Sequence, residues 1–193
     1  MTASHKTLYV DGRPVGDVLV TGDIETDIAA VKSTIRAAGL ERPASSVDAL
    51  MQQAMSFATT ATFIYSAKLS KKPWDQFAVS PFVVNSVFSI ELYLKAIAKI
   101  FGKELHGHRL KTELFDNLPV AAVHAIDSLT LEYRNDKGKD APSDIRTVLD
   151  TLNNAFVAWR YAHEGKDTPY FKVSDSIAVL DILDAACRDS RKA

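Results

Sequence analysis

The chain has 193 residues, of which 47% are hydrophobic and 24% are charged, and its formal net charge is −1. These values are typical of a soluble globular protein with one domain, or one domain and an appendage. The near-neutral charge excludes a protein that holds long DNA by bulk charge, although it allows a local basic cleft.

Cysteine content and targeting signals indicate the cellular compartment in which the protein is expected. Cys187 is the single cysteine, which excludes an internal disulfide and a cysteine-rich metal framework. The N-terminal stretch MTASHKTLYVDG lacks the apolar region of a signal peptide. The apolar run in residues 81–102 is interrupted by polar and charged residues, so it is a poor membrane span. We therefore expect a cytoplasmic protein that does not bind a membrane.

The first part of the chain predicts a small mixed unit. Two β-prone runs, residues 7–10 and 15–20, flank the turn sequence Asp11-Gly12, which predicts a hairpin. Apolar residues then recur at intervals of four and three over residues 24–38, as in an amphipathic helix. We expect residues 1–44 to form an N-terminal appendage packed on the main domain.

Residues 45–193 carry a series of helical patterns. Long apolar stripes at helical spacing cover about 46–69, 81–102, 120–133, 143–164 and 174–188. Ser46 and Ser143 are expected to cap the first and fourth of these helices. A shorter helix is expected near residues 110–118, and a polar loop over 134–142. Long helices with short connections predict an all-α antiparallel bundle of about four or five helices.

Residues 81–102 are expected to form the central helix of the bundle, because they are apolar around most of the helical circumference. Glu91 and Lys95 are therefore unusual, since charged groups are rarely buried without a partner. Their spacing of four residues allows them to pair with each other. Alternatively, one of them pairs with a residue on another helix.

Three segments in order resemble HEPN-domain proteins of bacteria and archaea. They are VNSVFSIELYLKAI (84–97), HGHRLKTELFDNL (106–118) and NAFVAWRYAHE (154–164). The resemblance covers roughly residues 46–190 and leaves the N-terminal appendage unexplained. It implies a bundle of four or five helices that forms homodimers.

The resemblance also implies an activity. Many HEPN proteins are metal-independent ribonucleases of toxin–antitoxin, phage-defence or RNA-processing systems, in which an Arg and a His from each subunit meet in the dimer cleft. Cleavage beside a 2′-hydroxyl needs a proton acceptor, and negative charge accumulates on the phosphorus oxygens. A guanidinium suits that charge because it offers several donors in a rigid fork.

The nuclease motif of the family, Arg followed after four to six residues by His, does not occur in this chain. The one Arg–His pair in the expected helix is Arg160 and His163, with two residues between them. If the protein is catalytic, we expect Arg160 to stabilise phosphate, His163 to transfer the proton, and Glu91 and Lys95 to orient them. The product would carry a 2′,3′-cyclic phosphate, and no metal or other cofactor would be needed.

Structural interpretations of the same two residues stay open. Arg160 can form an ion pair with Glu91 or Glu164, and His163 can bond a free carbonyl at the helix C-terminus. The protein would then be a non-catalytic HEPN-fold module whose dimer cleft binds a partner protein, such as a cognate antitoxin, or a nucleotide.

Two loops carry weaker signals. Lys71, Lys72 and Trp74 combine charge with an aromatic ring, a pairing that can bind single-stranded RNA, although short basic runs are normally solvated. His106 and His108 could ligate one metal ion, but the sequence identifies no third ligand, so we expect no metal site. His108 is expected to mark the start of the following helix.

Overall fold

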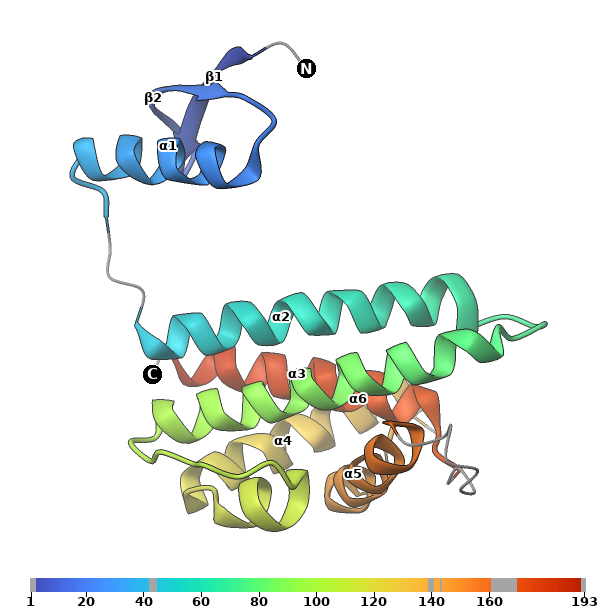
Figure 1. The fold of residues 1–193 in the computed structure, drawn as a ribbon. Coiled ribbons are helices and arrows are strands. Elements are labelled where there is room, and N and C mark those ends of the chain that lie inside the picture. The colour runs from blue at the N-terminus through green and yellow to red at the C-terminus, as the bar shows by residue number, and fades with distance from the viewer. Residues whose placement is uncertain (1–2, 42–44, 139–140, 143, 161–169, 192–193) are drawn as a thin grey trace. The chain divides into compact units, whose positions relative to one another are not determined.

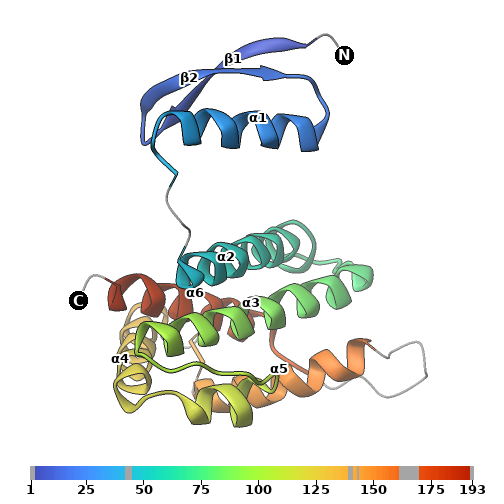
Figure 2. The ribbon, with the colours of Figure 1, turned by 60° about the vertical axis from the view of Figure 1, so that its left-hand side comes forward.

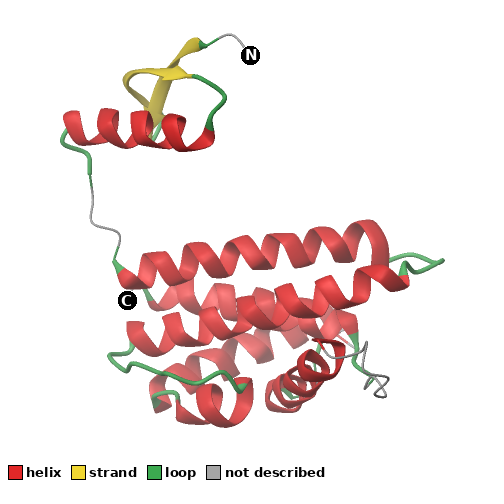
Figure 3. Ribbon diagram, viewed as in Figure 1, coloured by secondary structure: helices red, strands yellow, loops and turns green. Residues whose placement is uncertain are grey.

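A computed structural model describes residues 3–41, 45–138, 141–142, 144–160 and 170–191, and describes only the backbone of Trp159 and Arg160. The contacts divide the chain into two units, Met1–Ala44 and Ser45–Ala193. The first unit contains a two-stranded sheet and one helix, and the second is helical (Figures 1 and 3).

The N-terminal unit is a β-hairpin followed by a helix, as predicted. Strands β1 (Ser4–Val10) and β2 (Arg13–Val20) pair antiparallel, with Thr7 opposite Asp17. Asp11 and Gly12 form the turn, with φ of 51° and 75°, a geometry that suits an Asp-Gly pair. Helix α1 (Ile24–Ala37) packs on β2, and the Asp23 carboxylate caps it by accepting the Thr26 N–H.

The second unit is a bundle of long helices, which confirms the predicted helical class. Its elements in order are α2 (Ser46–Ile64), a π-helical turn (Tyr65–Leu69), a 3₁₀ turn (Gln76–Ala78), α3 (Val79–Ile100), a π-helical turn (Leu110–Leu114), a 3₁₀ turn (Phe115–Asn117), α4 (Val120–Lys137), α5 (Ile145–Arg160) and α6 (Val173–Ser190). Helix α3 contacts α2, α5 and α6, and α4 contacts α6 (Figure 2).

Helix α3 is the centre of the bundle, as its apolar circumference predicts. Phe82, Ile90, Leu94 and Ile97 have no solvent exposure. Within the described residues, the segment 76–100 is long and apolar enough to cross a membrane by length and composition alone. Its burial by the other helices is the pattern of a core helix in a soluble protein.

Several helix boundaries differ from the prediction. Ser45, and not Ser46, caps α2, because its hydroxyl accepts the Asp48 N–H. Ser143 lies outside the described residues, and at the start of α5 the Asp144 carboxylate accepts the N–H of Thr147. Helix α4 continues to Lys137, so it takes up the beginning of the predicted polar loop. A carboxylate or hydroxyl one residue away offers the same bond, which is why sequence alone misplaced the caps.

Helices α2 and α3 approach each other closely through small residues. The buried Ser89 hydroxyl on α3 donates a hydrogen bond of 2.8 Å to the main-chain oxygen of Ala54 on α2. A short side chain can reach a carbonyl on the facing helix only where the two backbones are close. Ala54 and Ser89 are both fully buried at this contact.

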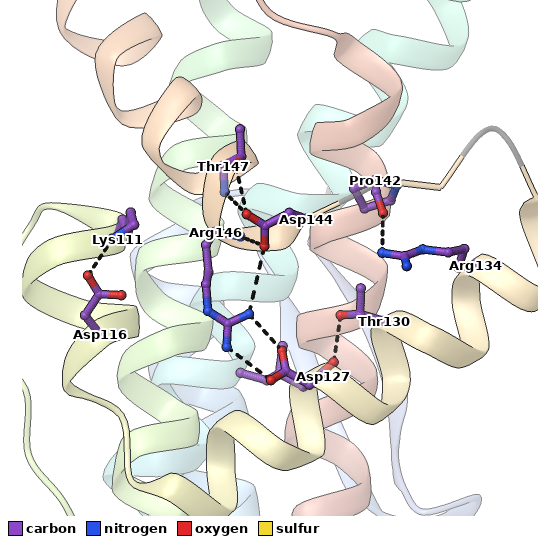
Figure 4. Close-up of polar contacts among 10 residues, drawn as sticks. Lys111, Asp116, Asp127, Thr130, Arg134, Pro142, Asp144, Arg146 and Thr147 are labelled. Atoms are coloured by element: carbon purple, nitrogen blue, oxygen red, sulfur yellow. Dashed lines mark hydrogen bonds and ion pairs between the residues drawn. The ribbon is translucent and has the colours of Figure 1, made fainter.

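A polar network joins α4 to α5 on another side of the bundle (Figure 4). The Arg146 guanidinium donates two hydrogen bonds of 3.1 Å to the Asp127 carboxylate and lies 4.9 Å from the centre of the Phe115 ring. Those bonds raise the pKa of Arg146. Bidentate pairing and ring stacking fix this guanidinium, so the network holds the helices together.

Cys187 is fully buried, and its burial and then the charge of Asp184 raise the pKa of the thiol to about 12. At pH 8 this leaves a thiolate fraction of about 10⁻⁴, against about 10⁻¹ for an unfolded thiol. We expect Ellman's reagent to label the native chain about 10³-fold more slowly than the chain in urea. Because the folded chain keeps the thiol neutral while the unfolded chain ionises it, the free energy of unfolding should fall as the pH rises from about 9 toward 12. Equal labelling rates in both states would contradict the buried position.

Candidate functional site

Glu91 and Lys95 pair with each other on α3, which is the first of the two arrangements considered from the sequence. The Lys95 ammonium donates to Glu91 Oε1 over 2.6 Å. The Glu91 and Lys95 side chains are 12% and 19% exposed, so the pair lies mostly within the protein. An ion pair in this setting is held more firmly than one on the open surface.

A histidine from a different part of the chain joins this pair. His108 Nδ1 lies 3.0 Å from the same Glu91 oxygen that Lys95 contacts. Because a carboxylate only accepts, Nδ1 donates, and a neutral imidazole in this tautomer keeps a lone pair on Nε2. The side chain of His108 is 85% exposed, so solvent and ligands can reach the ring. Glu91 thus orients an accessible histidine beside a lysine.

The loop that carries His108 is anchored by three hydrogen bonds from its main-chain N–H groups. The Glu113 carboxylate accepts the main-chain N–H groups of His108 and Arg109 over 2.9 and 3.1 Å. These bonds, that of His108 first, lower the pKa of Glu113. The N–H of Leu110 donates to Asn153 Oδ1 of α5 over 3.3 Å. The position of His108 therefore depends on backbone contacts as well as on Glu91.

Gly107 is required by the close approach of Glu113. A Cβ at position 107 would lie 2.5 Å from Glu113 Cβ, which is too close for two carbon atoms. We expect Gly107→Ala to displace the loop and to lower the free energy of unfolding by about 1–2 kcal/mol. Urea denaturation measures the effect, and Arg109→Ala, an exposed change in the same loop, should cost less than about 0.5 kcal/mol. A Gly107→Ala protein as stable as the parent would show that the loop adapts freely.

A pocket of about 570 Å³ lies beside these residues between α2, α3 and the loop. We call it the basic pocket, and its lining residues are Ser46, Ala49, Leu50, Gln53, Lys95, Lys99, Glu104, Leu105, His106 and His108. Lys99 donates to Glu104 over 3.1 Å, and this bond lowers the pKa of Glu104. Each lysine is paired with a carboxylate, Lys95 with Glu91 and Lys99 with Glu104, so an anionic ligand would compete with these carboxylates for the two ammonium groups.

The predicted catalytic residues fall into two groups. Lys95 lines the basic pocket, and Glu91 is bonded to Lys95. Arg160 ends α5, but its side chain lies outside the described part of the chain, as do His163 and Glu164. An interaction of Arg160 or His163 with Glu91 therefore stays a prediction.

The predicted RNA-binding loop lies away from the basic pocket. Lys71, Lys72 and Trp74 are exposed at the end of α3 that begins with Val79, and the pocket lies at the other end. A helix of this length spans about 30 Å. The Lys72 ammonium lies 5.2 Å from the centre of the Trp74 ring, which is 64% exposed. These residues form a separate exposed cluster.

Comparisons with protein-family models, curated proteins and solved structures found no significant match. The resemblance to HEPN-domain proteins therefore rests on the motifs of the chain itself.

The contact of His108 with Glu91 was not among the contacts predicted from the sequence. This hydrogen bond spans 17 residues, so no local pattern predicts it. The available signal was the segment His106-Gly107-His108 together with an acidic residue in a mostly apolar helix. In the described residues, no group of three or more His, Cys, Asp or Glu could hold a metal ion, so His106 and His108 gain no third ligand there.

Proposed function

We propose that this chain is a HEPN-like protein that acts on RNA as a cytoplasmic homodimer without a metal ion. The observation that carries the proposal is the Glu91 carboxylate, which contacts both Lys95 and His108 beside a pocket that Lys99 and His106 also line. A role in phage defence or in a toxin–antitoxin pair, with a cognate antitoxin as partner, is part of the same proposal.

The chemistry follows from the position of each group. His108 Nε2 accepts the proton of an RNA 2′-hydroxyl while Nδ1 stays bonded to Glu91. The 2′-oxygen attacks phosphorus, the bond to the 5′-oxygen breaks, and a 2′,3′-cyclic phosphate and a 5′-hydroxyl form. Lys95 and Lys99 lower the energy of the extra negative charge on the phosphoryl oxygens. Arg160 and His163 are candidates for the same stabilisation and for protonation of the leaving oxygen.

The test is incubation of the purified chain with single-stranded RNA oligonucleotides in EDTA. We expect fragments that end in a 2′,3′-cyclic phosphate, identified by mass. Matched oligonucleotides with 2′-O-methyl groups should stay intact because they lack the attacking hydroxyl. Cleavage of the 2′-O-methyl oligonucleotides, or cleavage that EDTA abolishes, would contradict the proposed chemistry.

The non-catalytic module is the second candidate, and one observation favours it. Lys95 and His108 both contact Glu91, an arrangement that would also serve simply to attach the loop to α3. In this case the basic pocket binds a nucleotide or an acidic segment of a partner protein without cleaving it. Fluorescence anisotropy would then show binding of labelled 2′-O-methyl RNA that Lys99→Gln weakens, while unmodified RNA stays uncut.

A further inference from the structure

The N-terminal unit leaves five large apolar side chains exposed. Among residues 3–41, Val18 is the one hydrophobic residue that is buried, and α1 has no buried residue. The exposed large apolar residues of the unit are Tyr9, Leu19, Ile24, Ile28 and Leu40. So few residues cannot bury enough apolar surface by themselves to be stable. A partner surface is therefore expected to cover part of the unit.

Strand β1 offers the better place for such a partner. The sheet in the described residues has two strands, so each strand has one unpaired edge. Helix α1 packs on β2, and β2 contains Pro14, which has no N–H to donate. β1 has seven residues and no proline, so no backbone donor is missing from its free edge, toward which the N–H and C=O groups of alternate residues point.

We propose that β1 pairs antiparallel with β1 of a second copy of this chain, which makes a four-stranded sheet in the order β2-β1-β1-β2. A second copy fits because an edge related to itself by a two-fold axis is self-complementary. With Thr7 on the axis, all seven residues of β1 are paired. Lys6 then lies opposite Leu8 of the partner subunit, so like charges do not face each other.

The test uses two cysteine variants of the full-length chain in a Cys187→Ala background. Thr7 and Asp17 lie opposite each other, and the Thr7 hydroxyl donates to Asp17 over 2.8 Å, so Thr7→Cys and Asp17→Cys lose the same hydrogen bond. Two Thr7→Cys residues would meet at the axis within disulfide reach. Two Asp17→Cys residues would be three strand spacings apart, about 14 Å, which is too far to bridge.

Under mild oxidation, we expect most of the Thr7→Cys chain to run as a covalent dimer on a non-reducing gel, and the Asp17→Cys chain to stay monomeric. Hydrogen exchange of the parent chain should show β1 amides more protected at high than at low protein concentration. Equal cross-linking of the two variants, or concentration-independent exchange of β1, would overturn the proposal. A chain that is dimeric in solution yet gives this negative result would be joined through its bundle instead, which leaves the proposed function intact.

Discussion

His108→Ala is expected to lower the rate of RNA cleavage in EDTA by about 10²–10⁴-fold, the usual contribution of a positioned proton-transfer group. The reason is that His108 Nδ1 is held 3.0 Å from Glu91, which leaves Nε2 able to accept a proton. The ring is 85% exposed, so its removal should change the free energy of unfolding little. The measurement is the initial rate of product formation under single-turnover conditions.

Two control variants separate a specific role of His108 from a general loss of positive charge. His106→Ala removes an exposed histidine of the same pocket that makes no described bond to Glu91, and its effect should be below about tenfold. Glu91→Gln keeps the shape but weakens the orientation of the imidazole, so it should reduce the rate less than His108→Ala. Full activity of His108→Ala with loss in His163→Ala would place the proton transfer at His163.

Glu91→Ala is expected to lower the free energy of unfolding by about 2–4 kcal/mol, because it leaves the Lys95 ammonium mostly buried without a counter-charge. The exposed fraction of the Lys95 side chain is 19%, and its ammonium lies 2.6 Å from Glu91. Urea denaturation followed by far-UV circular dichroism measures the change. Asp136→Ala, which removes one member of the exposed Asp136–Lys137 pair, should cost less than about 0.5 kcal/mol.

A double-mutant cycle with Lys95→Met tests the cause of this loss. If the cost comes from an unpaired buried charge, the double variant should be more stable than Glu91→Ala alone. The methionine side chain fills much of the same space without a charge. A double variant whose loss equals the sum of the two single losses would show that the residues act independently, and the ion pair would then not stabilise the protein.

The fold could be predicted from the sequence further than the site. The hairpin turn at Asp11-Gly12 and the central position of α3 follow from local composition and spacing, which a sequence displays directly. The pairing of Glu91 with Lys95 is one of the two arrangements that the sequence left open, and their spacing of four residues allows it. The contact of His108 with Glu91 depends on how a loop returns across α3, and the clash that fixes Gly107 depends on Glu113. Such contacts arise from tertiary packing, which residue patterns do not encode locally.

The hydrogen bond between Ser89 and the main chain of Ala54 has a consequence for any molecule that enters the basic pocket. Two helices locked at this distance cannot slide or separate without breaking a buried bond, so the two walls that they supply hold their shape when the pocket is empty. A preorganised pocket spends little of the binding free energy on rearrangement. Differences in affinity among related ligands of this pocket should therefore follow the direct contacts that each ligand makes with its walls.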